Sequence, residues 1–237
     1  SMDQQALVSN VVEEVLRRLG TGSTVATPGG DGGNATGSAG RDGLFDQVDA
    51  AVDHATEAQR QLVAAGLEAR DGICKLLKQI AIENAKTWGQ FEYDETGIGR
   101  LEHKSAKLEL LEGIPGVEFL KTVAHSNDDG IGLDEAAPWG VIGVITPVTH
   151  SIPTLTANAI NMIAAGNAMV CNPHPSGARS AALAATTYNK AIKQQFGIDS
   201  LINMIDPPTL RSAEEIFQHE RIPLLVATGG PGVARAA

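Results

Sequence analysis

The sequence has only two cysteines, Cys74 and Cys171, among its 237 residues. Both lie within apolar patterns and they are far apart in the chain. They therefore indicate neither a disulfide framework nor a zinc site. We predict no metal site, and a reducing, cytoplasmic compartment is the simplest interpretation of this cysteine usage.

Basic residues and long apolar runs are also scarce. Lys and Arg number 18 against 28 Asp and Glu, which gives a net charge of −10 at pH 7. Because no basic patch offsets this acidic excess, we expect no nucleic-acid partner. No apolar run approaches the ~18–20 residues needed to span a bilayer, so we expect no membrane partner. Hydrophobic residues still make up 43% of the chain, enough for one large domain or two small ones.

Residues 2–20 are predicted to form an amphipathic helix, followed by a Gly/Ser/Thr-rich linker over residues 21–42. The apolar residues of the helix form one stripe and the charged residues lie off it. The linker has almost nothing to bury and is typical of a flexible tether. A helix with an apolar face on such a tether indicates docking to a partner, although packing on its own domain is the alternative.

The remaining residues, 43–237, are predicted to form a nucleotide-binding domain of the α/β class. Two long helices, a turn, a shorter helix and a loop or hairpin are expected first. Their predicted ranges are Leu44–Ala65 and Glu68–Phe91 (separated at Gly66), Tyr93–Gly99, Leu101–Leu111 and Val117–Glu135.

Strand and helix patterns alternate from Pro138 onwards. Val141–Ile145 and Ala168–Cys171 are short apolar runs typical of strands buried on both faces, and residues at helical spacing connect them. This order predicts a Rossmann-like parallel sheet flanked by helices, with right-handed crossovers. The further strands are expected over Leu201–Ile205 and Pro223–Ala227, and the further helices over Gly177–Gln195 and from a Thr209 cap to about His219.

Polar loops follow three of these strands at their carboxyl ends, where ligands bind in open α/β sheets. Thr149, His150 and Ser151 could donate hydrogen bonds to a ligand carbonyl, although a lone loop histidine is more often structural. A glycine turn after the last strand could let the backbone approach a pyrophosphate at a helix N-terminus, or be a generic turn. The candidate binding residues are Thr146, Pro147, Val148, Thr149, Asn172, Pro173, His174, Gly229, Gly230, Pro231, Gly232 and Val233.

Cys171 is the cysteine that most invites a catalytic interpretation, because His174 lies close to it in sequence. A Cys–His pair could act as a nucleophile. Cys171 belongs to a predicted strand, however, and burial would raise the pKa of the thiol and lower its reactivity. We therefore expect it to be a core residue.

Several motifs occur together in a specific order. They are Glu95–Arg100 with Lys104 and Lys107, Pro115-Gly116, Pro138–Gly143, Thr146-Pro147, Ala165–Asn167, Asn172–Pro175 and Thr228–Gly230. In this order the motifs resemble the CoA-acylating aldehyde dehydrogenases of bacterial microcompartments, the propionaldehyde and acetaldehyde dehydrogenase group. The resemblance covers about residues 44–237, and the helix and linker at the front also fit this group.

The resemblance implies that a small aldehyde is oxidised to its acyl-CoA while NAD is reduced, with coenzyme A using much of the same cleft after NADH leaves. Carried over to this chain, Thr146–Thr149 would line the nicotinamide side and Asn172–His174 the adenosine side. Gly229–Val233 would lie near the pyrophosphate. The full-length enzyme would be a homo-oligomer in the microcompartment lumen, and residues 2–20 would dock onto a shell protein.

Two departures from the group affect the predicted chemistry. His150-Ser151 stands where relatives commonly have Asn-Pro, and that Asn helps to stabilise the thiohemiacetal oxyanion, so His150 is the candidate for this position. The nucleophilic cysteine of the group lies in a catalytic domain beyond the position of Ala237. The resemblance thus implies a cofactor-binding part that is inactive alone. The alternative is a non-catalytic nucleotide-binding or shell-docking module.

Overall fold

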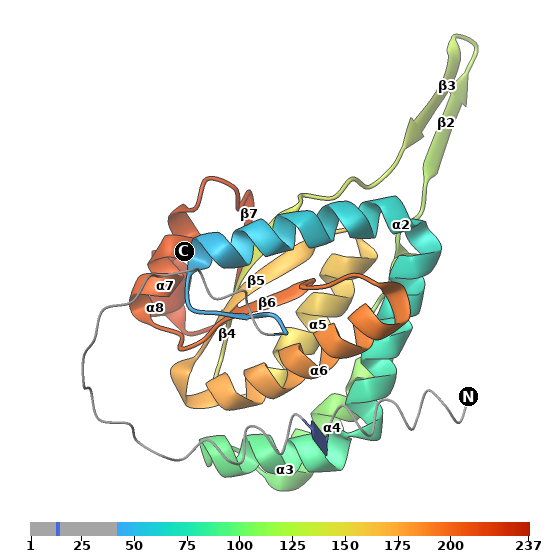
Figure 1. Cartoon of the computed structure of the whole chain (residues 1–237). Coiled ribbons are helices and arrows are strands. Elements are labelled where there is room, and N and C mark those ends of the chain that lie inside the picture. The colour runs from blue at the N-terminus through green and yellow to red at the C-terminus, as the bar shows by residue number, and fades with distance from the viewer. Residues whose placement is uncertain (1–12, 15–41) are drawn as a thin grey trace.

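The computed structural model describes residues 13–14 and 42–237, and a five-stranded parallel sheet lies at the centre of this part of the chain (Figure 1). The strand order is β1-β6-β5-β4-β7, and every neighbouring pair is parallel. The predicted Rossmann-like α/β architecture is confirmed. The strands are β1 Leu44–Phe45, β4 Val141–Thr146, β5 Ala168–Pro173, β6 Ile202–Ile205 and β7 Leu224–Ala227.

Helices surround the sheet, and α2, α5 and α6 also pack against one another (Figure 1). The α-helices are α2 Val48–Glu83, α3 Ala85–Thr96, α4 Leu101–Glu109, α5 Ser151–Ala164, α6 Ala178–Phe196, α7 Leu210–Gln218 and α8 Pro231–Ala236. Short 3₁₀ helices are η1 Leu110–Gly113, η2 Val117–Phe119 and η3 Pro175–Gly177.

The central strands are predominantly apolar because helices cover both faces of the sheet. All residues of β5 and β6 are buried. Trp88 of α3 meets Tyr188 of α6 edge to face, with ring centroids 5.6 Å apart. The Tyr188 hydroxyl lies 2.8 Å from Oγ1 of Thr156 on α5, so the aromatic contact joins three helices.

Several predicted boundaries in the first half of the domain are wrong. Leu44 begins strand β1 rather than a helix, because Leu44 and Phe45 pair with β6. The interruption at Gly66 is confirmed as a kink inside α2, where the residue has φ 81° and ψ −174°. The second helix does not run to Phe91: α2 ends at Glu83 and α3 continues to Thr96, through much of the predicted turn.

Residues 123–134 form a hairpin that projects from the body of the domain (Figure 1). Its strands, β2 Val123–Asn127 and β3 Gly130–Asp134, are antiparallel and exposed at every residue. Of the two alternatives stated for this segment, loop or hairpin, the hairpin is confirmed.

The predicted docking helix over residues 2–20 lies outside the described residues except for Glu13 and Glu14, which are helical. The predicted linker over residues 21–42 lies outside them except for Asp42. Among the helices that are described, none combines the length and apolarity required to cross a membrane.

Candidate functional site

The sheet has a topological switch point between β4 and β7. From β4 the chain proceeds to β5 and β6 on one side, and then returns to place β7 on the other side of β4. Diverging connections leave a crevice outside the carboxyl ends of such strands. A pocket of about 790 Å³ lies there. It is lined by His150 and by all the predicted cofactor residues except Pro231.

The loop after β4 forms one wall of this pocket. Nδ1 of His150 lies 2.7 Å from the hydroxyl of Thr149. Partial burial, followed by the positive charge of Lys107, lowers the pKa of His150 below its ordinary value. The imidazole is therefore mainly neutral at pH 7, and a neutral ring donates from one nitrogen only.

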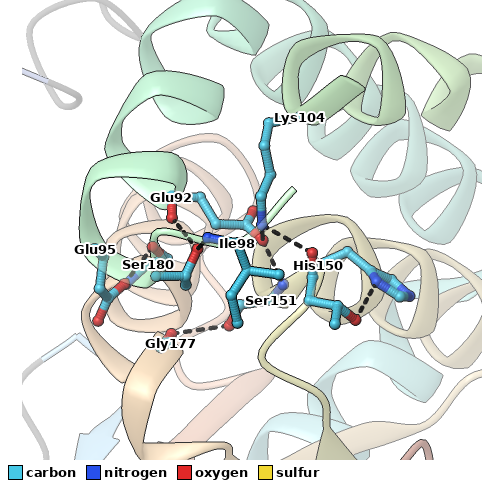
Figure 2. Close-up of polar contacts among 10 residues, drawn as sticks. Glu92, Glu95, Ile98, Lys104, His150, Ser151, Gly177 and Ser180 are labelled. Carbon is cyan, nitrogen blue, oxygen red and sulfur yellow. Dashed lines mark hydrogen bonds and ion pairs between the residues drawn. The ribbon is translucent and has the colours of Figure 1, made fainter. Parts of the chain in front are cut away.

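The N-terminus of α5, directly after this loop, is held by side chains from α3 and α4 (Figure 2). The Ser151 N–H donates to Oε1 of Glu92 over 2.8 Å, and Nζ of Lys104 donates to the Thr149 carbonyl over 2.8 Å. Glu92 and Lys104 also pair with each other at 2.9 Å. Sequence reasoning missed this pair, because the two residues are 12 positions apart on different helices and no local pattern indicates that they meet.

Two predicted binding residues direct their side chains toward protein partners. The Oγ1 of Thr146 lies 3.9 Å from Sγ of Cys171, and Thr146 is only 1% exposed. The side chain of Asn172 accepts from Oγ of Ser212 over 2.6 Å and donates to the Thr209 carbonyl over 3.2 Å. Asn172 therefore fixes the first turn of α7 at the edge of the pocket.

Helix α7 forms a wall that sequence reasoning did not assign to the site. The pocket-lining residues missed there are Thr209, Leu210, Ala213, Glu214 and Phe217. The helix lies close to β4 because Gly143 has no side chain: a Cβ there would come within 2.7 Å of Ile216. The sequence did contain a signal for this wall, the carboxyl end of the third predicted strand, Leu201–Ile205. Ligands bind at the carboxyl ends of strands in open α/β sheets, and this rule applies to the third strand as it does to the other three.

The glycine turn after β7 forms the opposite wall and opens α8, as predicted. Gly229 packs tightly, because a Cβ there would lie 3.1 Å from the Val233 side chain. A Cβ at Gly230 or Gly232 would instead meet no atom within 4 Å. The titratable groups on the pocket lining are His150, His174 and Glu214, so no lysine or arginine of the described chain lines it.

Neither cysteine is placed as a nucleophile. Burial raises the pKa of Cys171 to about 12, and burial is also the main reason why the pKa of Cys74 rises to about 12. The Sγ of Cys74 donates to the Ile160 carbonyl over 3.5 Å. Among the described residues, no three His, Cys, Asp or Glu side chains are grouped so that they could hold a metal ion.

Residues 38–237 match the aldehyde dehydrogenase family. The chain belongs to this family. An acetaldehyde dehydrogenase (acetylating) from Bilophila wadsworthia is 38% identical over 99% of this chain and 48% of its own length. A propanal dehydrogenase (CoA-propanoylating) from Salmonella typhimurium is 34% identical over 81% of this chain and 41% of its own length. This aldehyde dehydrogenase chain thus spans about half the length of these curated relatives.

Solved structures of aldehyde dehydrogenases give the same result. A propionaldehyde dehydrogenase from the fucose utilisation microcompartment of Clostridium phytofermentans superposes with a TM-score of 0.80 at 38% identity, covering 82% of this chain and 45% of that one. The Rhodopseudomonas palustris propionaldehyde dehydrogenase with bound propionyl-CoA gives a TM-score of 0.81 at 33% identity, covering 89% and 47%. The relatives therefore confirm the resemblance to CoA-acylating aldehyde dehydrogenases.

Proposed function

We propose that this chain is the cofactor-binding part of a CoA-acylating aldehyde dehydrogenase and binds NAD and coenzyme A in the switch-point pocket. The observation that carries the proposal is that residues at or beyond the carboxyl ends of four separate strands, β4, β5, β6 and β7, line one pocket. The relatives' activities support the reaction, oxidation of a small aldehyde to its acyl-CoA with reduction of NAD.

The shape and chemistry of the pocket fit a dinucleotide. Its volume of about 790 Å³ suits a large ligand, and apolar side chains such as Leu210 and Phe217 suit an adenine ring. The open space around Gly230 and Gly232 admits a close approach to the backbone. Because no lysine or arginine among the described residues lines the pocket, backbone N–H groups would have to balance a pyrophosphate. NAD, when bound, supplies the hydride acceptor, and coenzyme A supplies the acyl acceptor.

His150 is proposed for the oxyanion position. The Thr149 hydroxyl, 2.7 Å from Nδ1, can donate to that nitrogen, which leaves the proton of a neutral ring on Nε2. The Nε2–H could then donate to an oxygen that gains negative charge. A neutral imidazole at this position would donate without adding a permanent positive charge of its own.

We propose that residues 1–237 alone catalyse little or no aldehyde oxidation. A thiolate must attack the aldehyde for covalent catalysis, and both cysteines are buried with raised pKa values. These buried thiols also favour the second candidate function, a non-catalytic nucleotide-binding module. The two candidates predict the same binding and differ in whether the chain contributes to turnover of a complete enzyme.

Calorimetric titration with NAD and with coenzyme A, beside an NADH-formation assay with propionaldehyde, tests the proposal. We expect binding without turnover. Gly230→Leu should weaken NAD binding at least tenfold, because the new side chain would occupy open space on the pocket lining. The matched control is Gly113→Leu, at a glycine with equally open surroundings outside the pocket. Absence of NAD binding by the unaltered chain would refute the proposed function, and substantial turnover would refute the expected inactivity.

Residues 2–20 are proposed to dock this enzyme onto a shell protein, which would place it in the lumen of a cytoplasmic bacterial microcompartment. The support is the apolar stripe in the sequence and the microcompartment origin of the Clostridium phytofermentans relative. Co-sedimentation with shell proteins, with and without residues 2–20, tests this proposal. Equal sedimentation of both proteins would remove the docking role. Homo-oligomerisation of the complete enzyme likewise remains a proposal.

A further inference from the structure

One face of α3 carries two carboxylates, Glu92 and Glu95, that reach the N-termini of two other helices (Figure 2). Glu92 accepts from the Ser151 N–H at the start of α5. Glu95 accepts from the N–H groups of Arg179 and Ser180 at the start of α6. Neither α5 nor α6 has a capping side chain of its own, so α3 supplies both caps.

Glu92 differs from Glu95 because it also holds a buried cation. Lys104 is 2% exposed and Glu92 is 1% exposed. The Lys104 ammonium donates to Glu92 over 2.9 Å and to the Thr149 carbonyl over 2.8 Å. The pair therefore contacts the backbone immediately before His150, through Lys104, and immediately after it, through Glu92.

A contribution to folding stability is a weak explanation for the buried Glu92–Lys104 pair. Oε2 of Glu92 is buried without a hydrogen-bond partner. Removing two charges from water is costly, and apolar residues of similar volume are often as stabilising as a buried ion pair. An incompletely satisfied pair that spans a pocket-lining histidine is better explained by the position it imposes.

We propose that Glu92 and Lys104 are a positioning pair, which fixes the Thr149–Ser151 segment and so keeps His150 at the wall of the pocket. Ser151 is anchored a second time, since its hydroxyl donates to the Gly177 carbonyl over 2.8 Å. Thr149 is exposed, and its backbone carbonyl is held by Lys104. The part of the proposal that concerns a ligand rests on the proposed function.

The decisive variant is Glu92→Gln with Lys104→Met. The glutamine side chain retains an oxygen for the Ser151 N–H, and the methionine side chain fills a volume similar to that of lysine without a charge. Folding stability should stay close to that of the unaltered chain, whereas the bond to the Thr149 carbonyl is lost. The matched control removes an exposed pair, Lys193→Met with Asp199→Asn, whose side chains are 60% and 47% exposed.

The first measurement is the titration of the His150 ring by NMR, with the signal assigned from His150→Gln. In the unaltered chain, burial lowers the pKa of His150, and Lys107 and Lys104 lower it further while Glu92 raises it. His174 and Glu214 line the same pocket. The double variant removes one charge that raises the pKa of His150 and one that lowers it. A rise in this pKa would therefore report that the ring has become less buried, because burial is the main cause that lowers it. An unchanged or lower pKa would overturn the proposal, because removing these two opposing charges without moving the ring predicts no rise in the pKa of His150.

The second measurement compares NAD with ADP in the same variants. We expect the double variant to bind NAD about tenfold more weakly and ADP unchanged, because ADP lacks the nicotinamide end assigned to Thr146–Thr149. Equal NAD affinities in the variant and the unaltered chain would overturn the effect on the pocket. If the unaltered chain binds no NAD, the proposed function fails, and the His150 titration still decides the positioning role.

A conservative variant keeps the proposal testable if the double variant does not fold. Glu92→Asp preserves the charge opposite Lys104 and shortens the carboxylate's reach by one methylene group. It should therefore draw the Thr149–Ser151 segment away from its position and raise the pKa of His150. Retention of the original His150 titration in a folded Glu92→Asp protein would contradict the proposal.

Discussion

Cys171 lies in β5, three residues before His174, yet its thiol is enclosed within the sheet. With a pKa of about 12, only about 10⁻⁴ of the thiol would be ionised at pH 8. Cys74 is shielded in the same way between α2 and α5. We expect neither thiol to react with Ellman's reagent in the folded protein, because the thiolate is the reactive form.

Both thiols should react in full once the protein is unfolded in urea, which provides the internal control. The Cys171→Ala and Cys74→Ala variants then assign any signal to its residue. Rapid labelling of one equivalent in buffer at pH 8 would show that a cysteine is more accessible than the structure indicates.

The sequence predicted where the candidate binding residues lie in the fold better than it predicted the direction of their side chains. The rule for strand ends brought Thr146, Asn172 and Gly229 to one pocket. It could not show that the Asn172 amide is already bonded to Ser212 and Thr209, because this depends on how α7 packs.

At the scale of the helices, Glu95 of α3 caps the N-terminus of α6, and this cap should contribute to folding stability. Its two oxygens accept from the N–H groups of Arg179 and Ser180 at 2.8 and 2.7 Å, and the Ser180 hydroxyl donates to the same carboxylate. A carboxylate at a helix N-terminus also interacts favourably with the helix dipole. Glu95→Gln should therefore lower the free energy of unfolding by about 1–2 kcal/mol.

Urea denaturation at pH 7 measures this change. Glu109→Gln is the matched control, because Glu109 is an exposed glutamate in the last turn of α4 whose side chain makes no capping hydrogen bond. A Glu95→Gln protein as stable as the Glu109→Gln protein would contradict the capping role.

Helices and strands were predicted correctly where the sequence carries a clear local pattern. They were predicted wrongly where contacts with elements elsewhere in the fold determine the secondary structure. The apolar run at Val141–Ile145 and the cap at Thr209 both appear in the structure, the latter as a capping box with Ser212. Two residues, Leu44 and Phe45, are too few to show a strand period and become β1 only by pairing with β6. The helix end near Phe91 was misplaced because α3 packs against α4, the next helix along the chain, and against α6, which is distant in sequence.

At the scale of the whole molecule, the site is a consequence of topology. The chain places β7 on the far side of β4, and this return brings the glycine turn to face the loops after β4 and β5. Sequence order alone does not show on which edge of the sheet a strand will be added. The pocket therefore became visible as one site only with the strand order.

The projecting hairpin β2–β3 sets the last prediction. Val123, Ile131 and Leu133 are 50%, 78% and 65% exposed, so they contribute little to the core of the domain. Replacing Ile131 and Leu133 by serine should change the free energy of unfolding by no more than about 0.5 kcal/mol. Leu155→Ala, at a fully buried position of α5, should by contrast cost about 2–5 kcal/mol.

Exposed apolar side chains grouped on one arm favour association between molecules. We therefore expect the hairpin variant to self-associate less than the unaltered chain in sedimentation velocity over a concentration series, at nearly unchanged thermal stability. A large loss of stability would mean that the hairpin packs on the body. Unchanged association would mean that contacts between chains form elsewhere on the surface, because serine at these two positions removes the largest apolar side chains that β3 presents to solvent.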